Sequence, residues 1–364
     1  MIRWCPVIGG KRQGEVTVSQ AQVVYELHAV GRGLVTVAGL SVPPSEVEGF
    51  EACDNDGRVV HRMFVDSGRG SGDEVQREVT LAVVDEMGRL ANARAWPEPS
   101  GNWGAQAEDV FEGQASGALL YYLRRNIGAD ALPARQYGYR WLVLPDDPEV
   151  GGTVEARARF DGLLDLLADI ALVGKVVFAF GDDGALVVRE PVERAIEISE
   201  SVGTASRVDW AFSVPRATAL VAGGAGEGVD RLLVQVQNGA LVQSYGWRED
   251  FVNDSRFSVE SSLRQRAYAA LAARGGGWAA DALLANDSLI GLRWRMDWWI
   301  GDVFPVHLPD GVHMMTVKGV VVTYDNKGGR QLRLSLVESM HLNSPSWLDD
   351  GLGVDRRVRL LETA

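Results

Sequence analysis

Residues 160–188 read FDGLLDLLADIALVGKVVFAFGDDGALVV, a helical pattern followed by a tight hairpin with no recognisable catalytic group. In the first half, apolar side chains recur at helical spacing, while Asp161, Asp165 and Asp169 fall on the opposite face. The second half, 176–188, consists of two apolar strand-like runs joined by a Gly-Asp-Asp-Gly turn. We therefore predict a structural helix-plus-hairpin module here rather than an active site.

The glycine-rich stretch that follows, residues 217–228, reads ATALVAGGAGEG and has the composition of a nucleotide-binding loop. Such a loop must lead from a strand into a helix, because the helix N-terminus supplies the N–H groups that bind phosphate. Here it leads into another strand-like run, 231–237, and no Lys-Ser or Lys-Thr pair follows Gly228. The pattern favours a flexible hairpin tip over a nucleotide site.

Composition and charge exclude several classes of protein. With 364 residues, 46% of them hydrophobic, the chain has enough apolar material for two or three packed domains. The two cysteines, Cys5 and Cys53, are too few for a disulfide framework and match no zinc spacing, so we interpret them as buried thiols. No apolar run reaches membrane-spanning length, and the start of the sequence lacks the pattern of a signal peptide, so we expect a soluble protein.

The formal net charge of -13 opposes the counterion release that drives ordinary nucleic-acid binding. A protein that grips DNA is therefore disfavoured. A conduit through which DNA slides without sticking would, in contrast, benefit from walls of the same sign as the duplex.

Periodicity and turn residues predict the remaining elements. Strands are expected at 33–39, 58–65, 79–84, 292–300, 302–308, 313–324 and 330–337, the last four as a meander. Helices are expected at 85–95, at 116–127 with Ser116 as the N-cap, and from a capping box at Ser262–Gln265 to the glycines at 275–277. The loops 100–108 and 145–152 are candidate joints.

The search for metal-binding and catalytic residues yields no candidate. The histidines occupy no metal-ligand spacing; they are His28, His61, His307, His313 and His341. His307 and His313 flank a turn, but we interpret them as ordinary surface residues. The stretch Asp54–Gly57 resembles a calcium loop, yet Ala52 and Met63 stand where its first and last carboxylates are required.

The candidate nucleophiles and acid pairs likewise indicate no particular catalytic site. There is no G-x-S-x-G motif, and neither cysteine has a basic neighbour arranged to lower its pKa. The adjacent acids Asp182 and Asp183, and likewise Asp349 and Asp350, lie in a turn and in a charged tail. Carboxylates could still converge from distant strands.

Three tryptophans near the C-terminal end, Trp294, Trp298 and Trp299, alternate with Arg293 and Arg295 and could form a base-stacking platform. The alternation also predicts a strand with one face in the core and the other facing solvent or a neighbouring subunit. We favour the core or a subunit interface over nucleic acid.

Several blocks resemble minor tail proteins, or tail hubs, from actinobacterial phages with long non-contractile tails. Residues 79–99, VTLAVVDEMGRLANARAWPEP, resemble that family's strand, short helix and aromatic-Pro-x-Pro ending. Residues 159–168 and 217–228 resemble its middle block, and 301–337 its C-terminal strands. The resemblance covers most of residues 58–340.

The resemblance implies a mainly β, α+β fold similar to baseplate hubs, with two small tube-type β-barrels and an inserted helix-plus-hairpin module. The implied division is an N-terminal barrel domain at 1–100, a helical linker and helix-hairpin module at 101–204, a second barrel domain with one helix at 205–343, and a tail at 344–364. Residues 223–228 would form a hairpin tip of the second barrel.

The implied function is a homotrimeric hub at the distal end of the tail tube, part of the DNA exit channel. Its implied partners are other copies of itself, a distal tail protein or tube ring, the tape measure protein, tip or receptor-binding fibre proteins, and DNA passing without specific binding. We expect it in the virion at the tail tip after assembly in the host cytoplasm. The family has no catalytic motif to carry over, so no catalytic, cofactor-binding or metal-binding residues are predicted.

Two alternative functions remain open from the sequence. The chain could be a tail-tip hydrolase of cell walls with carboxylates brought together by folding. It could also bind carbohydrate through exposed tryptophans such as Trp96, Trp103 and Trp247.

Overall fold

The computed structural model describes residues 2–40, 42–71, 78–139, 141–181, 184–255, 257–325 and 329–338. Strands take up 44% of it and helices 19%, so the predicted mainly β class is confirmed. The chain forms two compact units: unit 1 comprises 1–191, 283–301 and 319–334, and unit 2 comprises 192–282, 302–318 and 335–364. The four-part division expected from the sequence stays a prediction. No helix in the described ranges is long and apolar enough to cross a bilayer.

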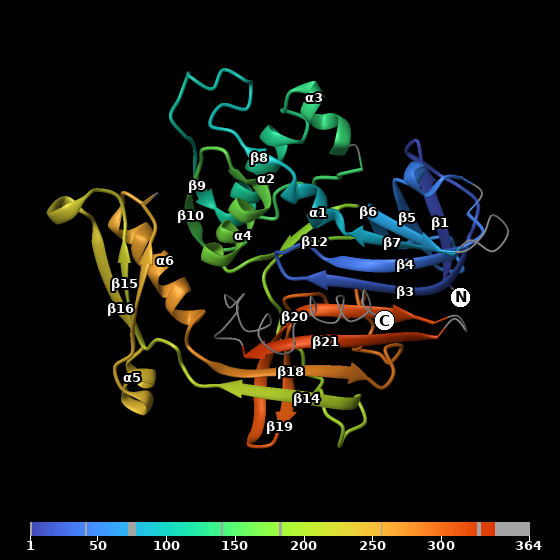
Figure 1. The fold of residues 1–364 in the computed structure, drawn as a ribbon. Helices are drawn as coiled ribbons and strands as arrows, with labels where there is room; N and C mark the ends of the chain where they lie inside the picture. Colours follow the sequence, from blue (N-terminus) through green and yellow to red (C-terminus); the bar gives the residue numbers. More distant parts are fainter. Residues whose placement is uncertain are drawn as a thin grey trace. The chain divides into compact units, whose positions relative to one another are not determined.

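An antiparallel sheet forms the larger part of unit 1 (Figure 1). Its strands follow the order β20-β3-β4-β7-β6-β5-β1-β2, with residues 319–324 of β20 pairing with β3. β7 alternates buried and half-exposed side chains, as the period-two pattern predicts. The bounds are β1 Arg3–Ile8, β2 Lys11–Arg12, β3 Thr17–Glu26, β4 Arg32–Ala38, β5 Gly49–Cys53, β6 Val59–Ser71, β7 Glu78–Val84 and β20 Gly311–Tyr324.

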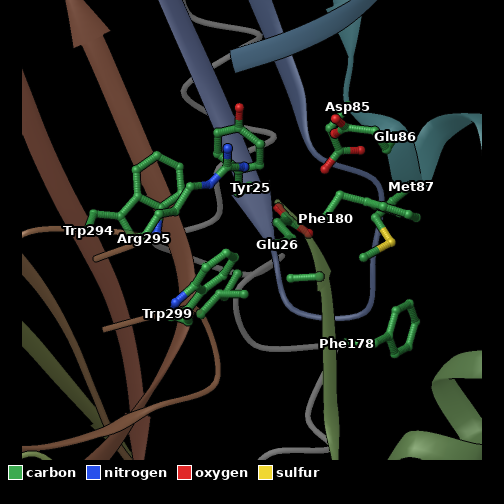
Figure 2. A pocket seen from close by; sticks show the side chains of 12 residues that line it. Tyr25, Glu26, Asp85, Glu86, Met87, Phe178, Phe180, Trp294, Arg295 and Trp299 are labelled. Atoms are coloured by element: carbon green, nitrogen blue, oxygen red, sulfur yellow. The ribbon is translucent and has the colours of Figure 1, made fainter. Parts of the chain in front are cut away.

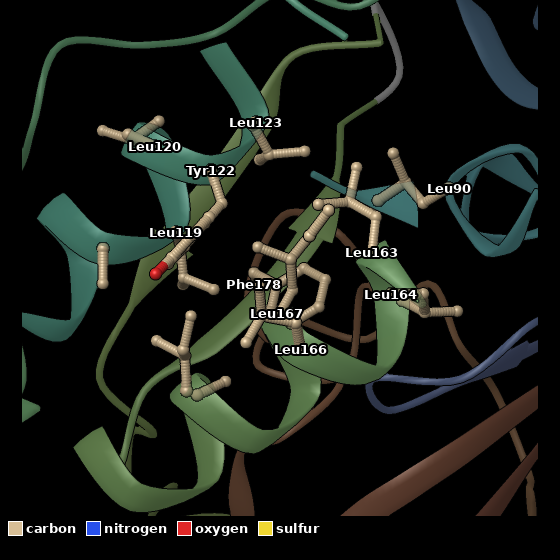
Figure 3. Packing of buried hydrophobic residues seen from close by; sticks show 14 of the residues in the cluster. Leu90, Leu119, Leu120, Tyr122, Leu123, Leu163, Leu164, Leu166, Leu167 and Phe178 are labelled. Atoms are coloured by element: carbon tan, nitrogen blue, oxygen red, sulfur yellow. The ribbon is translucent and has the colours of Figure 1, made fainter. Parts of the chain in front are cut away.

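The helix-plus-hairpin module predicted at 160–188 is present in unit 1. Helix α4 (Leu163–Gly174) packs against α2 (Ala115–Asn126), and the antiparallel hairpin of β12 (Val177–Phe180) and β13 (Leu186–Arg189) adds Phe178 to their core (Figure 3). The leucines at helical spacing on α4 are buried, which confirms that the pattern marks a packing face. The predicted turn residues Asp182 and Asp183 lie outside the described residues.

Shorter elements complete unit 1. β9 pairs antiparallel with β10, and β8 pairs with β11. The bounds are η1 Pro44–Glu46, α1 Glu86–Ala91, β8 Arg94–Ala95, β9 Asp109–Gln114, α3 Pro133–Gln136, η2 Tyr137–Tyr139, β10 Thr153–Ala158 and β11 Asp161–Gly162.

Two helix boundaries differ from the prediction. The helix expected at 85–95 ends at Ala91, because Arg94 and Ala95 pair with β11 instead of continuing it. Ser116 does not cap α2: the cap position is Gln114. The buried Ser116 hydroxyl instead donates to Asp147 Oδ1 at 2.6 Å and accepts from the amide of Val150 at 3.0 Å.

Unit 2 contains a second set of strands in the order β14-β18-β21-β20, with β19 pairing beside β20. These strands include three of the four predicted meander strands, at 302–308, 313–324 and 330–337. The bounds are β14 Ala205–Ser213, β18 Gly277–Leu284, β19 Val303–Leu308 and β21 Arg330–Glu338. Residues 311–318 of β20 and 335–338 of β21 belong to this unit, and residues 330–334 of β21 belong to unit 1.

A small α/β layer, residues 219–272, also belongs to unit 2. Helix α6 (Glu260–Ala272) packs on a three-stranded sheet of order β16-β15-β17 (Figure 1). The bounds are β15 Ala219–Gly223, η3 Gly228–Asp230, β16 Leu233–Gln237, α5 Gly239–Tyr245 and β17 Glu249–Asn253. The glycine stretch joins β15 to the antiparallel β16, so the predicted hairpin tip is confirmed. It belongs to this separate sheet, however, and not to a barrel.

Two further expectations are wrong. Helix α6 begins at Glu260 rather than at a capping box on Ser262, and Val259 takes the cap position. Residues 292–300 form turns instead of a strand. There the Asp297 carboxylate accepts hydrogen bonds from the amides of Gly291 and Arg293 and from the Arg293 guanidinium, and these local bonds hold the backbone in a compact turn.

Candidate functional site: an exposed aromatic edge strand

The first and outermost strand in the order of unit 2, β14, exposes large apolar side chains. Trp210 is 46% exposed and Phe212 64%, and Val214, which directly follows the strand, is 49% exposed. Trp210 and Phe212 project from the same face, because side chains two residues apart share a face of a strand. Within the part of the chain that the structure describes, β14 ends the strand order, and an edge strand with apolar side chains offers a backbone edge and apolar area to another chain.

Trp278 of β18 connects these rings to the rest of the unit. Its ring lies 5.4 Å from that of Trp210, 5.3 Å from that of Phe212 and 5.5 Å from that of His313 on β20. We call Trp210, Phe212, Trp278 and His313 the edge patch. Its side chains come from β14, β18 and β20, which the strand order brings together, with β21 between β18 and β20.

Charged groups surround the edge patch. His313 Nε2 lies 2.9 Å from Asp310 Oδ1, and its Nδ1 lies 3.5 Å from Glu338 Oε1. The other oxygen of Glu338 accepts from the Trp278 amide at 3.2 Å. Aromatic centres with a polar rim are typical of protein interfaces, in which Trp and Tyr supply much of the binding energy.

Unit 1 contains a pocket with aromatic walls and acidic groups, shown in Figure 2. Trp294, Arg295 and Trp299 lie on one side, and Asp85 and Glu86 on the other. The Asp85 carboxylate caps α1 by accepting from the Gly88 amide at 3.2 Å, and burial raises its pKa well above the usual value. Asp85 therefore has a structural role in the fold.

The histidines that the sequence offered as candidates do not converge. His61 is buried, with Nδ1 2.8 Å from the hydroxyl of Tyr25 and Nε2 2.6 Å from that of Tyr324. His28 is only partly buried, and its ring stacks on Phe178 with centroids 4.7 Å apart. Burial lowers the pKa of His28 to about 3 and that of His61 well below its usual value.

The two histidines of the β19–β20 hairpin lie on opposite faces. Val306 is paired with His313 and His307 with Val312, and neighbours along a strand point to opposite sides. In the part of the chain that the structure describes, no three His, Cys, Asp or Glu side chains are grouped to hold a metal ion. His341, Asp349 and Asp350 lie outside that part.

The tryptophans at 294–299 do not form the predicted alternating strand. Trp298 is fully buried, and its indole donates to the carbonyl of Leu292 at 2.9 Å. Met296, which an alternating strand would place on the same face as Trp298, is 64% exposed. The expectation of a core position is confirmed for Trp298, while the shared face with Met296 is wrong, because the turn breaks the alternation. The stretch Asp54–Gly57 is a plain turn in which Asp54 Oδ1 accepts from the amides of Asp56 and Arg58.

The edge patch was missed from the sequence. A signal was present, since Val208, Trp210, Phe212 and Val214 recur every second residue, which predicts an apolar strand face. The pattern does not show whether that face is covered. Only the exposure of Trp210 and Phe212 in the folded chain reveals that this face is open.

The model of the family described as Siphovirus ReqiPepy6 Gp37-like protein matches residues 49–336. The chain belongs to this family. The match includes most of the blocks on which the resemblance to siphophage tail proteins rested, and that resemblance is confirmed. None of the curated proteins matches the chain.

Solved structures share the fold at low sequence identity. A 43 kDa tail protein of prophage MuSo2 from Shewanella oneidensis is 15% identical with a TM-score of 0.62, over 94% of this chain and 99% of that one. Prophage tail protein gp18 from Listeria monocytogenes is 11% identical with a TM-score of 0.61, over 98% and 99%.

A third similar structure is the Escherichia coli c3393 protein, a type VI secretion component described as similar to the T4 tail proteins gp27 and gp5. It is 11% identical with a TM-score of 0.51, over 95% of this chain and 79% of that one. The family member described here thus has the predicted baseplate-hub-like fold.

Proposed function

We propose that this siphovirus protein is a structural component of the phage tail, a homotrimeric hub that connects the tail tube to tip or fibre proteins. The edge patch is the observation that carries the proposal. A subunit that closes a ring needs a surface that a second copy can cover, and the open side of β14 is such a surface. Family membership and the tail-protein fold support the same assignment.

Burial of the edge patch would supply much of the association energy. Removing a side chain of this size fully from water contributes about 1.5–3 kcal/mol. Trp210 and Phe212 each retain about half or more of their exposure in the single chain, so a neighbouring subunit has substantial apolar area to cover. Backbone hydrogen bonds along the edge strand would also fix the orientation of the neighbouring subunit.

The net charge of -13 supports a DNA exit channel with an acidic wall. Like charges disfavour adsorption of the duplex, so DNA would pass without specific binding. The remaining partners in this proposal are a distal tail protein or tube ring above, the tape measure protein, and tip or receptor-binding fibre proteins below.

We further propose that the role is not enzymatic. The buried carboxylates whose contacts are known serve the fold: Asp85 caps α1, Asp109 pairs with Arg125 at 3.3 Å, and Asp302 accepts from Arg194 at 2.8 Å. These groups are engaged in structural hydrogen bonds and ion pairs rather than directed at a shared substrate site.

The test is the oligomeric state, measured by light scattering coupled to size-exclusion chromatography, for the chain alone and co-expressed with its tail neighbours. We expect a trimer in at least one of these preparations. A double variant, Trp210→Lys with Phe212→Lys, should be a folded monomer, because charges at the patch would be buried unpaired.

A control is Val229→Lys, which introduces a single lysine at a fully exposed position of the same unit. It should assemble like the wild type. A wild-type protein that is monomeric in every preparation, or a double variant that still forms trimers, would contradict the proposal.

A further inference from the structure

A second exposed aromatic group lies in unit 1 and includes two of the tryptophans, Trp96 and Trp103, that the sequence offered for carbohydrate binding. Trp96 and Trp103 come from the loop after β8, and Phe160 from the turn between β10 and β11. The ring of Trp103 lies 5.0 Å from that of Trp96 and 6.0 Å from that of Phe160, at interplanar angles of 83° and 84°. With Arg135, whose guanidinium lies 4.0 Å from the centre of the Trp96 ring, these residues form what we call the Trp103 cluster.

Buried polar contacts hold the inner side of the cluster in place. The Asn126 side chain is fully buried, and its Oδ1 accepts from the Trp96 amide at 2.9 Å and from Arg135 Nη1 at 3.2 Å. Arg135 also donates to the carbonyl of Arg94. Trp96 and the guanidinium that covers one of its faces are thus fixed by the core, which leaves Trp103 and Phe160 to face solvent.

Phe160 occupies a backbone conformation that a bulky residue rarely adopts. Its φ is 63°, in the left-handed region where glycine or asparagine is usual. The turn is held by a hydrogen bond of 2.7 Å from the Phe160 amide to the carbonyl of Ala95, and by one of 2.8 Å from the Arg159 amide to Asp161 Oδ2. The strain presents a ring that is still 44% exposed, beside Trp103 at 52%. Strained residues that the surroundings hold in place are concentrated at ligand sites.

We propose that the Trp103 cluster binds a neutral saccharide. The C–H face of a pyranose ring is apolar and flat, so it packs on an exposed aromatic face, while its hydroxyl groups remain in contact with water and polar side chains. The near-perpendicular rings of Trp103 and Phe160 offer one surface for the face of the sugar and another for its edge.

Charge and size favour a neutral saccharide over other occupants. Residues 100–107, the loop that carries Trp103, include no acidic or basic side chain; the side chain of Asn102 is exposed, whereas the amide of Gln106 donates to the carbonyl of Pro97. The positive charge of Arg135 is already engaged by Trp96, Asn126 and the carbonyl of Arg94. Two open rings are also far short of the roughly 800 Å² per partner that a stable protein interface buries.

The site is tested by titrating the intact protein with neutral oligosaccharides, with tetra-N-acetylglucosamine and mannohexaose as first probes in a wider neutral panel. Binding is followed by isothermal calorimetry and tryptophan fluorescence. We expect saturable binding of at least one probe, weakened tenfold or more in Trp103→Ala and in Phe160→Gly. Glycine accepts the left-handed backbone, so the second variant keeps the turn while removing the ring.

Two further variants separate the site from general effects. Trp247→Ala removes another exposed tryptophan, in unit 2, and Phe160→Tyr keeps an aromatic ring; both should bind within twofold of the wild type. The proposal is overturned if no saccharide of the panel binds, if Trp103→Ala and Phe160→Gly bind normally, or if Trp247→Ala abolishes binding. Saturable binding of a decaproline peptide without any saccharide would also overturn it.

Discussion

In unit 1, His61 is buried among aromatic rings, whereas in unit 2 a similar group of side chains is exposed. His61 contacts the hydroxyls of two tyrosines and lies 6.4 Å from the ring of Trp4, with all of these side chains buried. In the edge patch, His313 lies near Trp278, whose neighbours Trp210 and Phe212 are exposed. The same side-chain types therefore stabilise the single chain in one place and are available for association in the other.

The largest loss of stability should come from removing a buried aromatic ring. Trp4 is 4% exposed and packs against Phe50, His61 and Tyr324, so Trp4→Ala should lower the free energy of unfolding by about 3–5 kcal/mol through lost burial and a residual cavity. Urea denaturation followed by circular dichroism measures the loss. A change below about 1 kcal/mol would mean that the aromatic group around His61 does not stabilise unit 1.

An intermediate loss of stability is expected when the pH is lowered. The pKa of His28 is lowered to about 3 in the folded protein, so below its usual value of about 6.5 the unfolded chain binds a proton that the folded protein does not. Stability is therefore complete above about pH 6.5 and is lost as the pH falls. Between pH 7 and pH 5 the loss from this residue should be about 2 kcal/mol.

His28→Asn isolates this contribution. Asparagine tolerates the left-handed backbone of this position, where φ is 56°, and carries no titrating group. Asp85, whose raised pKa acts in the opposite direction, is present in both proteins and cancels in the difference. Urea unfolding at several pH values should show that the variant loses less stability than the wild type as the pH falls. Equal losses would contradict the lowered pKa of His28.

The smallest loss of stability is expected from a substitution in the edge patch, measured on the dissociated chain. Because Trp210 is already 46% exposed and its ring contacts that of Trp278, Trp210→Ser should lower the unfolding free energy of the monomer by only about 1 kcal/mol. The measurement is urea denaturation at a concentration where light scattering detects only monomer. A loss comparable to that of Trp4→Ala would show that the edge patch is part of the core and remove the contrast between the two units.

Local periodicity predicted much of the fold. The leucines of α4, the β12–β13 hairpin and the strand pattern of β19 to β21 lie where the sequence placed them, because burial of one face selects the spacing of apolar residues. The glycine stretch was correctly assigned to a hairpin, since a strand rather than a helix follows it. These features depend on residues that lie close together in the sequence.

The errors have a common cause in side-chain hydrogen bonds. At 292–300, alternating residues suggested a strand, but the bonds made by Asp297 stabilise a turn instead. Ser116 had the right residue type for a helix cap, yet Asp147, 31 residues further on, binds its hydroxyl. Secondary-structure propensity reveals neither of these hydrogen-bond partners.

The sequence by itself determined the mainly β class, the helix-plus-hairpin module, the absence of known catalytic motifs and the resemblance to phage tail proteins. These conclusions follow from spacing, composition and local motifs. Only the tertiary structure decided which aromatic residues are sealed and which are open, because exposure depends on strand order and on contacts between distant segments. It placed Trp103 beside Phe160 and left β14 at an edge, and these two arrangements carry the proposals for ligand binding and subunit assembly.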